Sequence, residues 1–110
     1  MSVSTDGILC YGIALEDESA EHYRVEEIFE EYDELYKKHE DNIVHHCSDE
    51  CTMLIIAAAK SVKKAWRGYP KELGQNIYSD PKWEEEIREV CKALGVEYRQ
   101  PQWLLCSYWG

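Results

Sequence analysis

Hydrophobic and polar residues follow two different periods along the chain, and the period predicts the element. Residues 7–15 and 102–109 are short apolar runs without a charged side chain, which predicts strands, the first of them covered on both faces of a sheet. Residues 43–47 and 52–58 predict two further strands, and the turn residues 48–50 between them predict a hairpin. Strands are therefore expected at both ends of the chain and in its middle.

A helical period marks two other segments. From Ala20 to about His39, hydrophobic residues recur at i, i+3, i+4 and i+7, and Ser19 is a typical helix N-cap. The hydrophobic stripe of this helix consists of Val25, Ile28, Phe29, Tyr32, Leu35 and Tyr36. A second amphipathic helix is expected to start at Asp80-Pro81 and to stop at Gly95.

The order of these elements predicts the fold class. Residues 60–67 fit both a strand and a helix, so their structure stays open at this point, and residues 70–79 are expected to be loop. The remaining elements have the order β-α-β-β-α-β. That order predicts a single α+β domain over residues 1–110, with a mixed or antiparallel sheet of about four strands and two main helices packed on it.

Charge is distributed unevenly, and this changes the functional picture. The chain has 22 acidic and 12 basic side chains, a net charge of −10, and residues 1–50 hold 15 of the acidic residues but only three of the basic ones. An acidic half argues against direct nucleic-acid binding, which needs basic surface, and favours a basic protein partner. The side of the first helix opposite the hydrophobic stripe is acidic, and it is either a solvated face or a partner-binding surface. Its residues are Glu26, Glu27, Glu30, Glu31, Asp33 and Glu34.

One short segment combines the residue types of a zinc site. His45, His46, Cys47 and Cys51 bring two imidazoles and two thiols within seven residues. A closed zinc site usually takes a second ligand pair elsewhere, and the remaining cysteines stand singly in predicted strands and helix. Ordinary strand and turn roles are therefore favoured over zinc or a cysteine nucleophile, and no metal, cofactor or catalytic residue is assigned.

A basic segment follows the predicted hairpin. Its charged and aromatic side chains could hold an anionic small ligand, such as a nucleotide, by charge and stacking, or could form no more than an exposed basic edge. The residues of this candidate ligand site are Lys63, Lys64, Trp66, Arg67 and Tyr69. Because the sequence shows no phosphate-binding glycine loop and no nucleophile motif, we expect a binding protein and not an enzyme.

Cysteine usage and the apolar runs bear on location. The five cysteines are odd in number and scattered through apolar segments, which favours buried free thiols in a reducing compartment over disulfides. No apolar run reaches the roughly 20 residues of a membrane span, and the first residues lack the basic and apolar regions of a secretory signal. These features predict a cytoplasmic protein with no membrane association.

Separated pieces of the sequence carry motifs: Met1–Gly12 and Trp103–Gly110 at the ends, with His46-Cys47-Ser48, Met53 and Arg67-Gly68-Tyr69-Pro70 between them. Together they resemble a group of small bacteriophage and prophage proteins that begin with S-T-D-x-I-L-x-Y-G and finish at W-L-x-x-S-Y-W-G. The long acidic helix is not part of this resemblance. The resemblance implies a phage accessory gene expressed in a bacterial cytoplasm, and it carries over no catalytic residue.

These observations predict a small acidic phage-encoded accessory protein. The expected activity is non-enzymatic inhibition of a host defence complex, similar to that of an anti-CRISPR protein, with the acidic helix face imitating the charge of nucleic acid. The partner would be a host protein or nucleoprotein complex with a basic surface, and self-association into a homo-oligomer stays open. The alternative function is a small-ligand binding protein or sponge that holds a nucleotide signal at the basic and aromatic segment.

Overall fold

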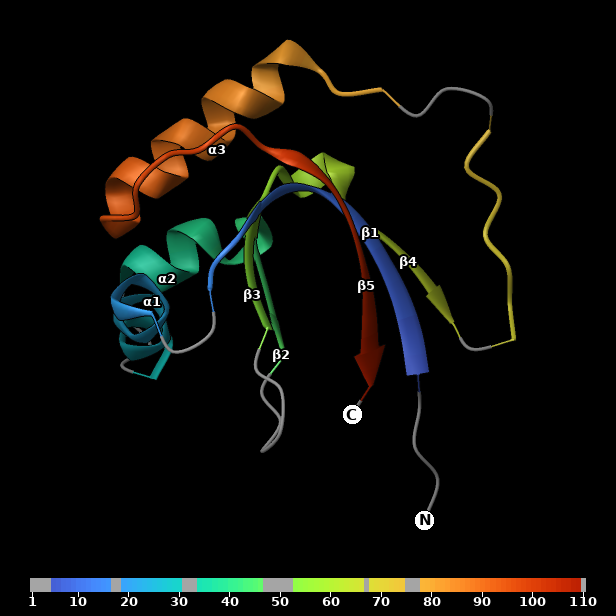
Figure 1. Ribbon diagram of the computed structural model, residues 1–110, viewed down its shortest axis with the longest axis horizontal. Coiled ribbons are helices and arrows are strands. Elements are labelled where there is room, and N and C mark those ends of the chain that lie inside the picture. Colours follow the sequence, from blue (N-terminus) through green and yellow to red (C-terminus); the bar gives the residue numbers. More distant parts are fainter. Residues whose placement is uncertain are drawn as a thin grey trace.

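The chain folds into a curved antiparallel sheet with helices packed against one of its faces (Figure 1). The computed structural model describes residues 5–16, 19–30, 34–46, 53–66, 68–74 and 78–109, with the backbone alone at positions 5, 6, 29, 30, 46, 53, 108 and 109. The predicted α+β class is confirmed, and of the two sheet types left open by the sequence the structure has the antiparallel one. In order, the elements are β1 (Thr5–Ala14), α1 (Ala20–Glu30), α2 (Glu34–His39), η1 (Glu40–Asn42), β2 (Ile43–His46), β3 (Met53–Ala57), η2 (Ala59–Ser61), β4 (Lys63–Trp66), α3 (Pro81–Leu94) and β5 (Gln102–Trp109).

The described residues form five strands and three α-helices, where the sequence predicts about four strands and two helices. The additional strand is β4, so residues 60–66, left open by the sequence, form the end of the 3₁₀ turn η2 followed by a strand, whereas residue 67 lies outside the described residues. A single helix from Ala20 to about His39 is wrong: α1 and α2 run in different directions (Figure 1), and residues 31–33 lie outside the described residues. A straight 20-residue helix would span about 30 Å. Ile28 of α1 and Leu35 of α2 both pack against the same core cluster.

β1 is the central strand because both of its edges are paired. Along one edge it pairs with β5 over eight consecutive residue pairs. The other edge is divided, with β4 beside residues 6–9 and β3 beside residues 12–14. β3 pairs in turn with β2, which confirms the predicted hairpin, although residues 47–52 of its turn lie outside the described residues.

The switch from β4 to β3 falls at Tyr11, where a buried serine replaces a strand partner. The Tyr11 amide donates to Ser61 Oγ at 2.9 Å, and the Tyr11 carbonyl accepts from the Ala58 amide at 3.1 Å. Ser61 lies in η2, is fully buried, and donates its hydroxyl proton to the Ala58 carbonyl at 2.7 Å. Because a buried amide without a partner is costly, this hydroxyl allows β1 to bend between its two neighbours (Figure 1).

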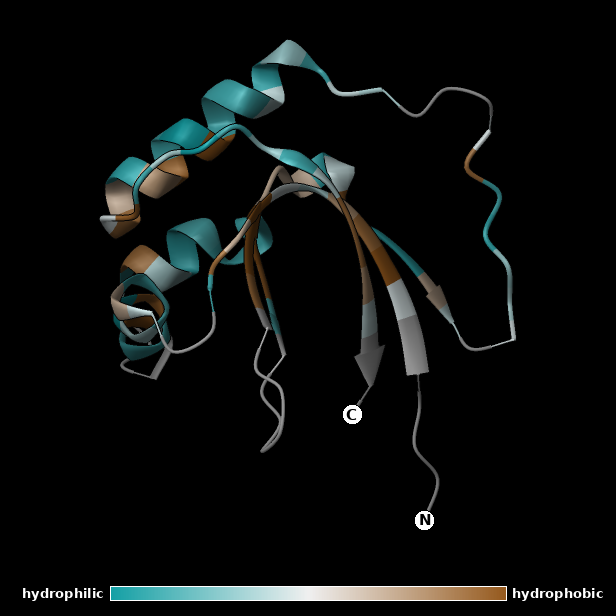
Figure 2. Cartoon of the chain, viewed as in Figure 1, coloured by the Kyte–Doolittle hydropathy of each residue, from teal (hydrophilic) through white to brown (hydrophobic). Residues whose placement is uncertain are grey.

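The sheet buries side chains on both faces, as the uncharged residues 7–15 predict. On the helix-covered face, β1 contributes Tyr11 and Ile13 to a cluster completed by Leu15, Val25, Leu54, Ile56, Ala58, Ile87, Val90, Cys91, Leu94 and Val96. On the opposite face, β1 contributes Ile8 and Cys10 to a cluster completed by Val44, Ile55 and Ala57. Figure 2 shows the hydrophobic residues of α3 turned toward the sheet and its hydrophilic residues turned away.

The helix termini follow their sequence signals. Ser19 Oγ accepts from the His22 amide at 3.1 Å and Asp80 Oδ1 from the Lys82 amide at 2.9 Å, which confirms both predicted N-caps. α3 ends at Gly95, whose φ of 72° is a left-handed conformation that glycine adopts readily. The predicted apolar face of α3 is buried at Ile87, Val90, Cys91 and Leu94. None of the described helices is long and apolar enough to cross a membrane.

Candidate functional site

The residues of the candidate acidic surface divide into those used inside the fold and those left on the surface. Glu26 is used internally: its Oε1 lies 2.5 Å from Nε2 of His22, which is only 2% exposed. Glu27 and Glu34 are exposed, and no hydrogen bond or ion pair among the described residues engages them. The other three are not fully described, namely Glu30, with its backbone alone, and Glu31 and Asp33, which lie outside the described residues.

Two further charged residues attach α1 to the segment that follows α3. Arg24 Nη1 donates to the Gly95 carbonyl at the C-terminus of α3. Glu21 Oε2 accepts from the Glu97 amide at 2.6 Å, and Glu21 Oε1 lies 3.6 Å from Arg99 Nη2. Charged side chains therefore fasten α1 to the segment that follows α3, and this contact holds the exposed side of α1 in a fixed position.

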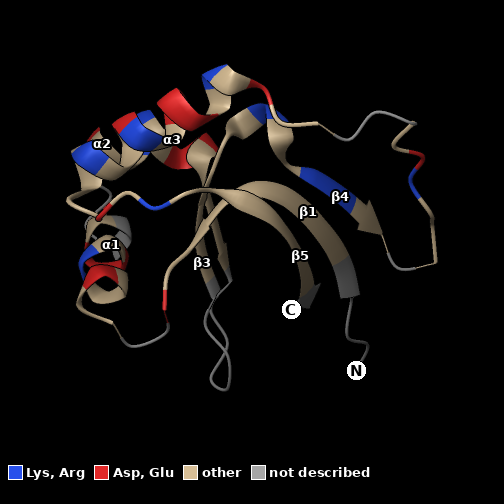
Figure 3. Ribbon diagram, turned by 45° about the horizontal axis from the view of Figure 1, so that its top comes forward, with Lys and Arg blue, Asp and Glu red and all other residues tan. Residues whose placement is uncertain are grey.

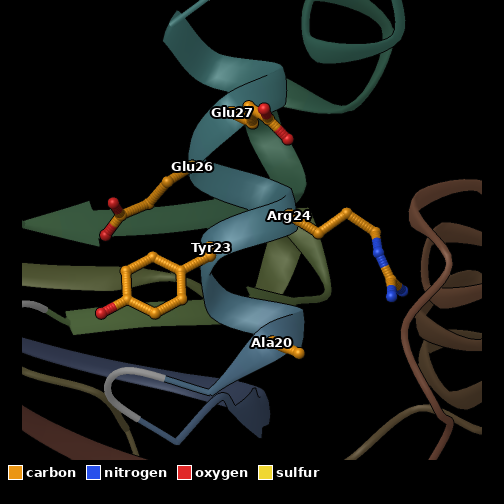
Figure 4. Close-up of a pocket in the computed structure, with 5 residues that line it drawn as sticks. All are labelled: Ala20, Tyr23, Arg24, Glu26 and Glu27. Atoms are coloured by element: carbon orange, nitrogen blue, oxygen red, sulfur yellow. The ribbon is translucent and has the colours of Figure 1, made fainter.

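A shallow depression of about 530 Å³ follows the exposed side of α1 (Figure 4) and is lined by Ala20, Tyr23, Arg24, Glu26 and Glu27. Tyr23 is 57% exposed. Its ring lies on the same side of the helix as the Glu26 carboxylate, whereas Arg24 points to the opposite side (Figure 4). Tyrosine is enriched at the centres of protein interfaces. An exposed tyrosine beside carboxylates in a shallow depression therefore suits contact with a protein better than enclosure of a small ligand.

A second hollow, here called the aromatic pocket, lies between β4, β5 and the start of α3. It has a volume of about 230 Å³ and is lined by Lys60, Lys63, Leu73, Tyr78, Asp80, Trp83 and Trp103. Lys63, Trp83 and Trp103 come from β4, α3 and β5, and Lys60 comes from η2. The segment between β4 and α3 supplies Leu73, Tyr78 and Asp80.

The structure separates the residues that the sequence suggests as one ligand site. Lys63 lines the aromatic pocket, whereas Lys64 faces the other side of β4 and lines a different hollow of about 260 Å³. Successive strand residues point to opposite faces, which explains this separation. Trp66 and Tyr69 are 69% and 75% exposed, and Arg67 lies outside the described residues.

The aromatic pocket has a rigid back wall. Trp83 and Trp103 meet edge to face with ring centroids 6.0 Å apart, and Tyr11 packs against them at 6.2 and 5.6 Å, respectively. The Tyr11 hydroxyl donates to Glu84 Oε1 at 3.1 Å, and the same oxygen accepts from Gln100 Nε2 at 3.0 Å. Burial, together with the bond to Glu84, raises the pKa of the Tyr11 hydroxyl, which therefore remains protonated at neutral pH. Both indoles are thus held by the core.

The histidine- and cysteine-rich segment lies mostly outside the described residues. Of its four candidate ligands, only the His45 side chain is described; His46 has its backbone alone, and Cys47 and Cys51 are outside. Whether this segment takes zinc or forms an ordinary turn stays a prediction. Within the described residues, no group of three His, Cys, Asp or Glu side chains could hold a metal ion.

The described cysteines are free thiols: Cys10, Cys91 and Cys106. Burial raises the pKa of Cys10 and of Cys91 to about 11, and burial also raises the pKa of Cys106. Because the thiolate is the reactive form, these three thiols are weak nucleophiles at neutral pH.

Sequence reasoning misses six residues that line the aromatic pocket, namely Lys60, Leu73, Tyr78, Asp80, Trp83 and Trp103. Two of them, Trp83 and Trp103, fit apolar helix and strand patterns, and nothing in those local patterns indicates that they meet. Strand alternation is the signal that separates Lys63 from Lys64, but it applies only once residues 60–67 are assigned to a strand.

No protein-family model, curated protein or solved structure matches the chain. Its function must therefore be inferred from two features: the exposed carboxylates of α1 and α2, and the aromatic pocket.

Proposed function

We propose that this chain is a phage-encoded binding protein that inhibits a host defence complex, without catalysis, by covering a basic surface of that complex. The contact surface is the acidic segment, defined as α1 and α2 with their exposed carboxylates. One observation carries the proposal: Glu27 and Glu34 are exposed and their side chains have no partner among the described residues, in the half of the chain that holds 15 of its 22 acidic residues. The resemblance of the chain ends to phage proteins supports the proposed setting.

The internal use of other carboxylates supports this assignment. Glu21 and Glu26 of α1 make contacts within the fold, and so does Glu86 of α3, which accepts from Asn42 Nδ2 at 2.6 Å and from the Ala59 amide at 2.8 Å. Carboxylates that hold elements together have a structural reason to be present. Glu27 and Glu34 do not make such contacts among the described residues, and like charges crowded on a helix oppose its stability. A basic partner would give them a role.

Charge and aromatic contact would contribute differently to binding. An exposed ion pair contributes only about 0.2–1 kcal/mol, and at 0.15 M salt the screening length is about 8 Å. The carboxylates therefore act mainly on the association rate and on partner choice. Tyr23, 57% exposed in the depression along α1, is the residue suited to supply affinity. Figure 3 shows the acidic residues of α1 at the opposite end of the molecule from basic β4.

A matched pair of charge reversals tests the proposal. Glu27→Lys/Glu34→Lys alters the acidic segment, and Glu85→Lys/Glu89→Lys makes the same change in net charge on exposed positions of α3. Binding is measured against purified CRISPR effector complexes carrying guide RNA at 0.05, 0.15 and 0.5 M salt. Plaque counts on a host with the same system active report protection of the phage.

We expect the first variant to lower the association rate about tenfold or more at 0.15 M salt and to abolish protection. The α3 variant should retain both properties, and circular dichroism should show both variants folded, because surface substitutions usually change stability by less than about 0.5 kcal/mol. Equal behaviour of the two variants would show that net charge alone acts. A wild-type chain that binds none of the effectors and protects no phage would overturn the proposal.

A further inference from the structure

The composition of the aromatic pocket differs from that of every surface used in the proposed function. Three aromatic rings, from Tyr78, Trp83 and Trp103, line a hollow of about 230 Å³ together with the ammonium groups of Lys60 and Lys63. The pocket lies in the basic half of the chain and shares no residue with the acidic segment. The aromatic pocket is therefore suited to a different kind of ligand from the acidic segment.

The aromatic walls are fixed before any ligand binds. The planes of Trp83 and Trp103 meet at 81°, and both rings rest on Tyr11, which is 5% exposed and bonded to Glu84. Two nearly perpendicular indoles leave an angular space that a flat ring can enter, stacking on the face of one indole and turning its own edge toward the other. Tyr78, which also lines the pocket, is 68% exposed. Such walls select a planar apolar group.

The lysines of the pocket are not engaged elsewhere. Among the described residues, neither Lys60 nor Lys63 forms an ion pair or a cation–π contact. Asp80, the carboxylate in the lining, accepts the Lys82 amide as the N-cap of α3. Two positive charges thus face one carboxylate that already has a hydrogen-bond donor. An ammonium group at a partly enclosed site attracts an anion more strongly than it does in open water.

We propose that the aromatic pocket binds a small planar aromatic anion. Its ring would lie among Tyr78, Trp83 and Trp103, and its anionic group would contact Lys60 and Lys63. Pockets for drug-sized ligands measure about 300–1,000 Å³, so a hollow of about 230 Å³ accepts one ring system with one anionic substituent. A nucleoside monophosphate and an aromatic carboxylate share this chemistry. This inference is independent of the proposed inhibition.

The probes for the binding test are AMP and GMP for the phosphate class, and indole-3-carboxylate and benzoate for the carboxylate class. Adenosine, indole and inorganic phosphate each lack one of the two required groups. Affinity is measured by isothermal titration calorimetry. Because Trp83 and Trp103 line the pocket, tryptophan fluorescence gives an independent signal.

Two matched pairs of variants test the position of the ligand. Lys63→Gln is compared with Lys64→Gln, the neighbouring lysine on the other side of β4. Tyr78→Ala is compared with Tyr69→Ala, a tyrosine that is 75% exposed and does not line the pocket. Each pair makes the same chemical change at adjacent or comparably exposed positions. Thermal unfolding of the free proteins checks that all four variants are folded.

We expect at least one aromatic anion to bind with a Kd below about 1 mM. Lys63→Gln should weaken binding about tenfold or more, as loss of a charge-assisted contact does, and Tyr78→Ala should weaken it about five- to a hundredfold through lost stacking. Lys64→Gln and Tyr69→Ala should stay within about twofold of the wild type. The class that binds identifies the anionic group as phosphate or carboxylate.

Three results would overturn the proposal. The first is that none of the four aromatic anions binds with a Kd of 1 mM or below. The second is that adenosine, indole or inorganic phosphate binds as tightly as the matching anion, because one half of the pocket would then suffice. The third is that Lys64→Gln reduces affinity as much as Lys63→Gln, because the effect would then come from net charge.

Discussion

Gly12 is the position in β1 where adding a single methyl group should be most damaging. A Cβ atom at Gly12 would lie 2.2 Å from the Ile56 carbonyl oxygen, 2.8 Å from Ala57 Cα and 3.0 Å from Ala57 Cβ. Two of these are backbone atoms of the paired strand β3, which cannot rotate aside as the end of a side chain can. To restore a contact of roughly 3.5 Å, β1 would have to move from the Ile56 carbonyl by about 1.3 Å.

The expected cost follows from that displacement. Overpacking a well-packed interior costs about 1–3 kcal/mol, and we expect about 3 kcal/mol because the strand pairing itself must shift. Replacing glycine by alanine also restricts the unfolded chain, which offsets about 0.4–1 kcal/mol. The net loss of about 2–2.6 kcal/mol corresponds to a fall in the melting temperature of about 8–10 °C, at about 4 °C per kcal/mol for a domain of this size.

Gly7→Ala is the matched control, because Gly7 lies in the same strand and a Cβ atom there would meet nothing within 4 Å. Neither glycine has a positive φ, so the comparison isolates space from backbone conformation. Urea unfolding followed by circular dichroism gives the free energy of unfolding of each variant. If the two variants unfold within about 0.5 kcal/mol of each other, the close approach of β1 and β3 is refuted.

Two further predictions concern β5 and a buried thiol. Deleting residues 102–110 removes the partner of one whole edge of β1, so calorimetry should show no cooperative transition; a truncated chain that keeps one would contradict this. Burial raises the pKa of Cys10 from 9.0 to about 11 in the folded state, so its stabilising contribution is complete below pH 9 and is lost as the pH rises through about 11. Cys10→Ala should therefore flatten the decline in unfolding free energy between pH 9 and 11, and an equally steep decline would exclude this thiol as its cause.

Local signals account for the parts of the fold that the sequence predicts correctly. Asp80-Pro81 and Gly95 define α3 because capping and the left-handed stop depend on a few adjacent residues. The uncharged run in β1 requires burial on both faces, which only a central strand provides. Hydrophobic spacing also gives the inward residues Val25 and Leu35, yet it does not indicate whether the helix axis stays straight between them.

The candidate sites are harder to predict from sequence than the helix caps or the central strand, because they depend on residues that only the fold brings together. The helical pattern places Glu26 on the solvated face of the helix. In the structure, however, its carboxylate contacts the buried imidazole of His22, one turn earlier in the helix. The aromatic pocket joins Lys63, Trp83 and Trp103, which stand on three different elements. Sequence alone indicates that positive charge and aromatic residues are present, and the sheet register decides which of them share a face.

The two proposed binding sites depend on the fold to different degrees. With 22 acidic and 12 basic side chains, ten carboxylates have no basic counterpart within the chain, whatever fold it adopts. That surplus is visible in the sequence, and it limits the class of partner without locating the contact. The aromatic pocket has the opposite property, because its walls rest on Tyr11 at the bend of β1 and exist only once the sheet has formed. Substitutions at the exposed Glu27, Glu34 or Tyr78 can therefore separate binding from stability, whereas substitutions at Trp83 or Trp103 would change both.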